Sequence, residues 1–387
     1  MEYFLTEEQI MVRDLARQFA QEQIAPVAAH YDQTGEFPWD IIKKMAELDF
    51  FRTFVEEEYG GINAGSMGMV LITEEFARAC GGIALGYAGT MLGALPLLIA
   101  GSDEQKQKYC PDLADGKFLM GFGLTEPEAG SDAASIKTTA IKDGDEYVLN
   151  GTKRFITNGG VGKLYSVIAL TNPSKGARGA SAFLVEEGTP GFTYGKKEDK
   201  MGIRASATCE LVFEDCRIPA ANRLGKEGMG FIIAMKTLDQ SRPGVAAQAL
   251  GIAQGAFDHA VKYSRERIAF GQPISAFQAI QHKLANMATE IEAARGLIYG
   301  CAKMVDSGVK DFSKESAMAK LFAADTAMRV TTEAVQIFGG YGYSKEYPVE
   351  KYMRDAKITQ IYEGTCEIQR GVIGQAVIKE AASRKKA

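Results

Sequence analysis

The stretch Gly123-Leu124-Thr125-Glu126-Pro127-Glu128-Ala129-Gly130-Ser131-Asp132 lies at the point where the pattern of the sequence changes. The residues before it repeat apolar side chains with a helical period, whereas the residues after it place glycine, proline and asparagine between short apolar runs. The helical period returns after Phe231. The sequence therefore predicts three domains in the order helical, β and helical, over residues 1–120, 121–230 and 231–387.

Local signals support each of these domains. Thr6 and Gln9 have the spacing of a capping box, and further helical patterns cover residues 38–48 and 67–100. Asn150-Gly151 between two apolar runs predicts a hairpin turn, because both central positions of that turn need positive φ. In the last domain, apolar side chains alternate spacings of four and three, as in a helix packed in a bundle: Ile280, Leu284, Met287, Ile291, Ala294 and Ile298. We expect an antiparallel β domain between two sets of packed helices.

The composition narrows the class of protein. Of the 387 residues, 46% are hydrophobic and 24% are charged, which is typical of a globular protein in solution. A net charge of −5 without a dense basic block argues against nucleic acid as a partner. The longest apolar run, residues 91–100, is about half of a membrane span, so we interpret it as a buried helix. The acidic start predicts no signal peptide, and the six scattered cysteines fit a reducing compartment. We therefore expect a cytoplasmic location, in a bacterium.

Missing motifs exclude several kinds of site. The sequence contains no Gly-x-Gly-x-x-Gly fingerprint, no Walker A loop and no Gly-x-Ser-x-Gly elbow. Its three histidines, His30, His259 and His282, are far apart, and no two cysteines are spaced as zinc ligands. We therefore expect no Rossmann dinucleotide site, no serine-histidine triad and no metal centre.

Two of the four remaining clusters lie in the β domain. The stretch 123–132 offers backbone N–H groups and hydroxyls that could bind polar ring edges or phosphates, although a solvated connection is the alternative. Residues 151–158 bring Phe155 close to Thr157, which could combine ring stacking with a hydroxyl hydrogen bond. A surface strand explains this second cluster about equally well.

The other two clusters lie in the C-terminal domain. Residues 265–271 and 338–342 combine arginine with consecutive glycines, which suit a pyrophosphate. A helix C-cap at Gly271 and a tight turn at Gly339-Gly340 are the alternative. In residues 361–370, Glu363 precedes a helix for which Thr365 is the candidate N-cap, and a loop glutamate is usually solvated.

Together, and in this order along the chain, the four clusters resemble the acyl-CoA dehydrogenase family. The resemblance implies an α+β protein with an N-terminal α-helical domain, a middle antiparallel β-barrel or sandwich and a C-terminal four-helix bundle. It also implies that FAD lies between the β domain and the C-terminal helices. A second subunit completes the cofactor site, within a homotetramer that is a dimer of dimers.

The resemblance assigns roles to individual positions. Flavin contacts are implied for Phe122, Leu124, Thr125, Gly130, Ser131, Phe155, Ile156 and Thr157, with Phe155 in place of the family's frequent tryptophan. Contacts to the FAD of a neighbouring subunit are implied for Arg267, Phe270, Gln278, Gln336, Ile337, Phe338, Gly339 and Gly340. Adenine-side FAD contacts are implied for Thr365 and Glu367. Contacts to the CoA substrate are implied for Ser131, Asp239, Arg242 and Gly364.

Glu363 corresponds to the catalytic base of the family. Some members place the base on an earlier helix, where this chain has Ser241, and serine cannot act as that base. Removing a proton next to a thioester requires a carboxylate with a raised pKa, which burial against an apolar acyl chain supplies. The resemblance implies that the Glu363 backbone N–H helps to bind the thioester carbonyl and that hydride passes to flavin N5.

We therefore predict an FAD-dependent acyl-CoA dehydrogenase that acts on a short, branched or alicyclic acyl-CoA and passes electrons to an electron-transferring flavoprotein. Alternatives on the same fold are an enoyl-CoA reductase and an acyl-CoA oxidase. A non-catalytic CoA- or flavin-binding assembly protein is the alternative from another class, and the retained Glu363 argues against it. Ile83 replaces an arginine of decarboxylating members, and the uncharged residues 81–100 are expected to wall the acyl pocket.

Overall fold

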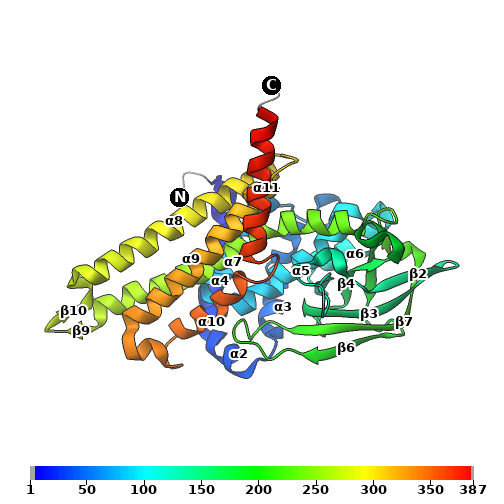
Figure 1. Ribbon diagram of the computed structural model, residues 1–387. Helices are drawn as coiled ribbons and strands as arrows, with labels where there is room; N and C mark the ends of the chain where they lie inside the picture. Colours follow the sequence, from blue (N-terminus) through cyan, green and yellow to red (C-terminus); the bar gives the residue numbers. More distant parts are fainter. Residues whose placement is uncertain (1–4, 385–387) are drawn as a thin grey trace.

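The computed structural model describes residues 5–384 (Figure 1). The residues Met1–Phe4 at the acidic start and the tail residues Lys385 and Lys386 lie outside this range, so the interpretations that rest on them stay predictions. Helices, then a sheet, then helices follow one another along the chain, as the sequence predicts.

The N-terminal part is helical. Its helices are α1 (Glu7–Phe19), α2 (Ala28–Thr34), α3 (Trp39–Glu47), α4 (Gly65–Ala79), α5 (Gly81–Ala100) and α6 (Asp103–Ala114). The predicted capping box is confirmed, because Gln9 N–H donates to Thr6 Oγ1 at 3.2 Å and Thr6 N–H donates to Gln9 Oε1 at 3.1 Å.

Helix α5 contains the apolar run at residues 91–100 and lies within the predicted helical pattern over residues 67–100. Pro96 lies inside it without ending it, and the helix is 20 residues long. Among the described residues it is the one helix that is long and apolar enough to cross a membrane, but 67% of its apolar window is buried inside the protein. The prediction of a buried helix is therefore confirmed, and the helix covers residues 81–100.

The middle part is a mixed sheet. Its strands are β1 (Met120–Gly123), β2 (Thr139–Asp143), β3 (Glu146–Thr157), β4 (Leu164–Leu170), β5 (Ala180–Glu186), β6 (Phe192–Lys197), β7 (Thr208–Pro219) and β8 (Arg223–Leu224). They are ordered β6-β7-β3-β2-β4-β5-β8, with β1 paired to β4. The prediction of a wholly antiparallel domain is corrected, because both β1 and β2 pair with β4 in parallel. The long connection through the β2–β3 hairpin permits this parallel pairing.

The hairpin prediction at Asn150-Gly151 is wrong. Both residues lie inside β3, where the pairing with β7 shifts register between Leu149 and Gly151. Gly151 has φ +143, and a Cβ there would lie 2.6 Å from Thr138 Oγ1. Asn150 holds the irregularity in place, since its amide donates to Asp215 Oδ1 at 3.1 Å and its Oδ1 accepts from Asp215 N–H at 2.8 Å. The asparagine-glycine pair therefore forms a β-bulge rather than a turn.

The C-terminal part is built on three long helices. Its helices are α7 (Gly230–Glu266), α8 (Gln278–Asp306), α9 (Ser313–Phe338), α10 (Val349–Thr359) and α11 (Cys366–Arg384). The apolar face predicted for residues 280–298 is confirmed in α8. Of its six apolar positions, the last four are buried and the first two are partly buried. The short hairpin of β9 (Ile268–Ala269) and β10 (Gln272–Pro273) lies at the opposite end of the molecule from the large sheet (Figure 1). Helix α11 projects away from the body of the protein.

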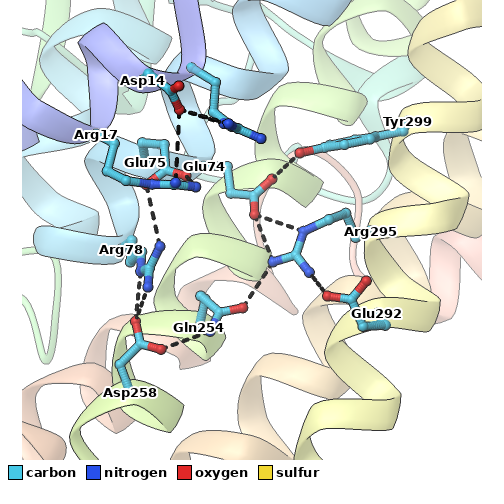
Figure 2. Close-up of polar contacts among 11 residues, drawn as sticks. Asp14, Arg17, Glu74, Glu75, Arg78, Gln254, Asp258, Glu292, Arg295 and Tyr299 are labelled. Atoms are coloured by element: carbon cyan, nitrogen blue, oxygen red, sulfur yellow. Dashed lines mark hydrogen bonds and ion pairs between the residues drawn. The ribbon is translucent and has the colours of Figure 1, made fainter. Parts of the chain in front are cut away.

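A buried polar network fixes the helices to one another (Figure 2). Glu74 on α4 accepts from both Nε and Nη2 of Arg295 on α8, at 3.0 and 2.8 Å, and from the Tyr299 hydroxyl at 3.0 Å. Arg295 also donates to Gln254 on α7 at 2.9 Å. Beside this network, Arg17 on α1 donates a hydrogen bond to Glu75 on α4 at 2.7 Å. These contacts fix α7, which carries part of the site described next.

Candidate functional site

A pocket of about 210 Å³ lies among the sheet, α5, α7 and the loop before α11. Many of the residues singled out from the sequence line it: Phe122, Leu124, Thr125, Gly130, Ser131, Phe155, Ile156, Thr157, Arg242, Glu363 and Gly364. The expected wall also lines it, through Leu85, Ala88, Gly89, Met91 and Leu92 of α5. The fold therefore gathers residues from all three parts of the chain into one cavity.

A buried ion pair holds the loop after β1 against β3. Lys153 is fully buried, and its Nζ donates to Glu126 Oε1 at 2.6 Å and to the Leu124 carbonyl at 3.1 Å. Glu126 also accepts from the backbone N–H groups of Lys137 and Thr138, at 2.6 and 3.0 Å. Because a buried charge is tolerated only when it is paired and hydrogen-bonded, this arrangement fixes the position of Leu124 at the pocket.

Phe155 presents an aromatic ring at the pocket. Its φ is +58, which is unfavourable for an aromatic residue, and its side chain is 57% exposed. The next residues hold this backbone in place, because Asn158 is buried and its amide donates to Thr90 Oγ1 at 3.1 Å and to the Met120 carbonyl at 2.9 Å. The hydroxyls of Thr125 and Thr157 form no hydrogen bond within residues 5–384. An exposed ring and free hydroxyl groups on one pocket fit a planar heteroaromatic cofactor.

Glu363 lies in a tight turn between α10 and α11. Its φ is +51, and that of Gly364 is +93. The Ser241 hydroxyl of α7 donates to Glu363 Oε2 at 2.5 Å. Burial raises the pKa of Glu363, and this effect exceeds the opposing effects of the Ser241 hydrogen bond and of the positive charges on Arg242 and Lys320.

Donors from three helices hold the backbone carbonyls of this turn. The Gln369 side-chain amide donates to the carbonyls of Glu363 and Gly364, both at 3.1 Å. Arg242 Nε lies 3.4 Å from the Glu363 carbonyl, and Lys320 Nζ donates to the Gly364 carbonyl at 2.7 Å. The turn is therefore held through its main chain as well as through the Glu363 carboxylate.

A chain of hydrogen bonds forms part of the pocket lining. The Tyr362 hydroxyl donates to Gln248 Oε1, and Gln248 Nε2 donates to the Gly81 carbonyl at 2.8 Å. Gln248 is buried, and both side chains line the pocket. These polar side chains therefore form a fixed part of the lining that an acyl chain would contact.

Asp239 does not line this pocket. Its carboxylate accepts from Arg242 Nη1 at 2.6 Å and from the Ser313 hydroxyl at 3.0 Å, and it faces an adjacent groove between α5 and α7. Burial raises the pKa of Asp239. In this structure Asp239 orients Arg242, whereas its predicted contact with substrate stays a prediction.

A second set of the predicted residues lies far from the pocket: Arg267, Phe270, Gln278, Gln336, Ile337, Phe338, Gly339 and Gly340. The 26 positions between Ser241 and Arg267 correspond to about 39 Å of helix. Phe270 is 95% exposed at the tip of the β9–β10 hairpin, and the Arg267 guanidinium lies 5.3 Å from the Tyr341 ring centroid. Gly271 belongs to this hairpin and does not cap α7, which ends at Glu266.

Thr365 and Glu367 lie at the start of α11. Thr365 is the N-cap, as predicted, because its Oγ1 accepts from Ile368 N–H at 3.2 Å. The Glu367 side chain is exposed. Neither residue lines the pocket in this chain.

Sequence reasoning missed most of the polar residues around the turn. The sequence marks Ser241 only as a position that lacks a base, although its hydroxyl is a hydrogen-bond donor to Glu363. No local pattern marks Gln248, Lys320 or Gln369 as part of the site. One signal in the sequence could have indicated Lys320, which is the single lysine in the alanine-rich run at residues 316–324. A charged residue on a buried helix face needs a partner, so its presence there points to a polar contact.

Comparison with known proteins finds matches over nearly all of the chain. Three family models match: the acyl-CoA dehydrogenase N-terminal domain over residues 6–117, the middle domain over 121–216 and the C-terminal domain over 228–378. The acryloyl-CoA reductase (NADH) of Anaerotignum propionicum is 51% identical over 98% of this chain and 96% of its own length.

Two solved structures are similarly close. The butyryl-CoA dehydrogenase of Megasphaera elsdenii has a TM-score of 0.94 and 50% identity, over 97% of this chain and 99% of its own. A chain from work on the electron transferring flavoprotein of Acidaminococcus fermentans and flavin-based electron bifurcation has a TM-score of 0.95 and 51% identity, over the same shares.

The chain therefore belongs to the acyl-CoA dehydrogenase family. Its fold is the three-domain fold of that family, and it is an FAD-dependent oxidoreductase. The chain is similar both to a dehydrogenase and to a reductase. Membership of the family therefore does not define the acyl group or the direction of the reaction, and the arguments for both come from the site.

Proposed function

We propose that the protein oxidises a short acyl-CoA thioester to the α,β-unsaturated thioester, with Glu363 as the base that removes the α-proton. The observation that carries this proposal is the Glu363 carboxylate in a pocket that also holds the exposed Phe155 ring. A base and a stacking surface for a redox cofactor on one cavity are what α,β-dehydrogenation requires.

Glu363 has one carboxylate oxygen available for the proton. Ser241 occupies Oε2, whereas Oε1 has no hydrogen-bond partner within the described part of the chain. Burial raises the pKa of Glu363, which makes the carboxylate a stronger base than an exposed glutamate. Ser241 keeps the carboxylate oriented and in its charged form until the proton is transferred.

The main chain of the turn supports the same step. The Glu363 N–H donates to no acceptor within residues 5–384, so it is free to bind the thioester carbonyl. A hydrogen bond at that oxygen stabilises the negative charge that develops when the α-proton leaves. Arg242 and Gln369 hold the Glu363 carbonyl and so keep the N–H of the turn in place.

FAD, when bound, supplies the hydride acceptor. The residues that would hold its ring are Phe155, beside the ring, and Leu124, Thr125 and Thr157, around its polar edge. Ser131 on the same pocket is proposed to contact both cofactor and substrate. These assignments are supported by the free hydroxyls and the exposed aromatic ring described above.

A short acyl group is favoured by the size and the lining of the pocket. Its volume is about 210 Å³, the hydrogen-bonded pair Tyr362 and Gln248 forms part of its lining, and the α5 residues along its wall are uncharged. The relative from Megasphaera elsdenii is named for butyryl-CoA, a four-carbon thioester. Branched and alicyclic groups of similar length remain candidates for the test below.

The remote cluster supports a proposal about assembly. Arg267 lies about 39 Å along α7 from Ser241 in the pocket, and Phe270 and Gln336 do not line the pocket of their own chain. We propose a homotetramer, a dimer of dimers, in which this cluster contacts the FAD of a neighbouring subunit. We also propose an electron-transferring flavoprotein as electron acceptor, by analogy with the structure from work on the electron transferring flavoprotein of Acidaminococcus fermentans. A cytoplasmic location is proposed from the acidic start and the scattered cysteines of the sequence.

The direct test is anaerobic reduction of the bound flavin. The FAD-loaded protein is mixed with butyryl-CoA, isovaleryl-CoA or cyclohexanecarboxyl-CoA, and the loss of flavin absorbance is followed. We expect butyryl-CoA to bleach the flavin fastest and the Glu363→Gln variant not to bleach with any thioester.

The reductase is the second candidate function, favoured by the 51% identity to an acryloyl-CoA reductase. If no saturated thioester bleaches the flavin, but acryloyl-CoA reoxidises the chemically reduced protein, the direction proposed here is wrong. A protein that cannot be loaded with FAD would contradict both functions.

A further inference from the structure

Lys320 makes an unusual contact beside the catalytic turn. It lies on α9, its side chain is fully buried, and its Nζ donates to the Gly364 carbonyl at 2.7 Å. Gly364 directly follows Glu363, and both residues have positive φ. The ammonium group is therefore attached to the main chain of the turn and not to a carboxylate.

Two other buried lysines show the contrast. Lys153 pairs with Glu126 at 2.6 Å, and Lys351 pairs with Asp355 at 2.5 Å. Lys320 forms no ion pair within the described residues. Burying an ammonium without a carboxylate partner is costly, so a buried lysine whose single hydrogen bond is to a main-chain carbonyl needs an explanation.

We propose that Lys320 is a positioning residue, whose buried ammonium holds the Gly364 carbonyl and so keeps the left-handed turn that directs the Glu363 carboxylate toward the pocket. The expected effect of Lys320 on the rate of flavin reduction rests on the proposed function. The contact itself is independent of which thioester the protein uses.

The turn needs such support because of its conformation. A glutamate with positive φ is unfavourable and persists only where its surroundings fix it. Arg242 and Gln369 hold the Glu363 carbonyl, and Gln369 also reaches Gly364, but Lys320 makes the shortest of these contacts and carries a charge. Without it, the Gly364 carbonyl can turn and the carboxylate can leave Ser241.

Lys320 also acts on Glu363 through its charge. Its positive charge lowers the pKa of Glu363, against the larger effect of burial, and burial lowers the pKa of Lys320 itself to about 8. The charged and titratable groups around Glu363 are Asp239 and Arg242 on α7, Lys320 and Asp325 on α9, Asp355 on α10, Tyr362 beside it, and Cys366 and Arg370 on α11.

The test compares Lys320→Met with the wild type, both loaded with FAD. We expect unchanged FAD content, a flavin reduction rate at least about tenfold lower, and an acid limb of the pH profile moved upward by about half a unit or more. We also expect the crystal structure of the variant to show the Gly364 carbonyl turned and Glu363 Oε2 no longer bonded to Ser241. An unchanged turn or an unchanged acid limb would overturn the proposal.

The control is Lys314→Met, which removes the same charge from the same helix. Lys314 contacts Glu315 and Glu380 and does not touch the turn, so we expect the wild-type pH profile. If Lys320→Met does not fold, Lys320→Gln carries the same test with a polar group in the buried site. If no thioester bleaches the wild-type flavin, the proposed function fails, while the crystal structures still decide the role of Lys320.

Discussion

The Ser241 hydroxyl on α7 lies 2.5 Å from Glu363 Oε2, although 122 positions separate the two residues in the chain. Serine cannot remove the α-proton, but its hydroxyl donates a hydrogen bond to the carboxylate that can. A donor favours the charged form of a carboxylate, so Ser241 lowers the pKa that burial raises. The serine thus supports a base that lies elsewhere in the chain.

Ser241→Ala should move the acid limb of flavin reduction to higher pH. The base must be deprotonated to act, so the rate falls as the pH drops through the pKa of Glu363. Losing a hydrogen bond to a charged group, worth about 1.5 kcal/mol, raises that pKa by about one unit. Stopped-flow bleaching across the acidic range measures the shift. Ser264→Ala is the matched control, because Ser264 is also buried on α7 but bonds only to the Val261 carbonyl.

Glu363→Gln should abolish flavin reduction while FAD remains bound. The amide keeps the size of the side chain but cannot accept the proton, and losing a general base typically costs about 10²–10⁴ in rate. No other carboxylate among the described residues lines the pocket to replace it. Rapid-mixing bleaching together with the flavin-to-protein absorbance ratio tests this expectation. A variant that bleaches near the wild-type rate would remove Glu363 from the mechanism.

The sequence predicted the helical elements and the pocket residues that belong to contiguous motifs. The residues around Thr125 lie on one loop, and those around Phe155 lie on one strand. Because each group is contiguous in the sequence, a local motif was enough to find it. Ser241, Lys320 and Gln369 come from three different helices and meet only through tertiary packing, which no local pattern reports.

At two places the structure departs from a local preference of the sequence. Asn150-Gly151 has the residues of a hairpin turn, but the strand continues because β7 pairs on both sides of the bulge. Pro96 lies inside α5 without ending it, because α5 is so deeply buried that packing outweighs the lost hydrogen bond. In both places tertiary contacts override a local preference.

Arg295→Met should destabilise the protein strongly. The substitution removes both hydrogen bonds that Arg295 donates to the buried Glu74 carboxylate, so that of the Glu74 contacts in Figure 2 the one from the Tyr299 hydroxyl is left. Removing one partner of a buried ion pair costs about 3–5 kcal/mol of stability. The thermal unfolding midpoint, measured at fixed protein and FAD concentrations, should fall by several degrees. Arg217→Met is the control, since its pairs with Asp143 and Glu146 are half-exposed and worth about 1 kcal/mol or less. Equal shifts for the two variants would contradict the role given to the network.

The free energy of unfolding should depend on Lys320 in a defined pH range. Its pKa is about 8 in the folded protein and 10.5 for the unperturbed group, so the unfolded chain binds more protons between these values. The penalty for burying the charge is full below about pH 8, at about 3 kcal/mol, and disappears above 10.5. Relative to Lys320→Met, the wild type should therefore gain stability as pH rises through this range. Parallel denaturation curves for the two proteins at each pH would contradict this.

Arg267→Ala should weaken FAD retention and subunit association together. Arg267 follows the end of α7, about 39 Å from the pocket of its own chain, beside the exposed Tyr341 ring. In the proposed assembly its guanidinium pairs with the FAD pyrophosphate of a neighbouring subunit, a planar contact that lysine reproduces only as a point charge. Because FAD then binds only the assembled state, losing this contact shifts both equilibria.

The alternative for Arg267 is a solvated residue at a helix end. Its substitution would then change stability by no more than about 0.5 kcal/mol and leave the flavin in place. Gel filtration of wild type and variant at the same low concentration, with the flavin-to-protein absorbance ratio read across each peak, separates the two cases. Arg265→Ala is the matched control, because Arg265 lies in the last turn of the same helix and is not among the residues assigned to FAD. We expect a later elution and a lower flavin ratio for Arg267→Ala alone, whereas an unchanged elution and ratio would show that Arg267 does not bridge the subunits.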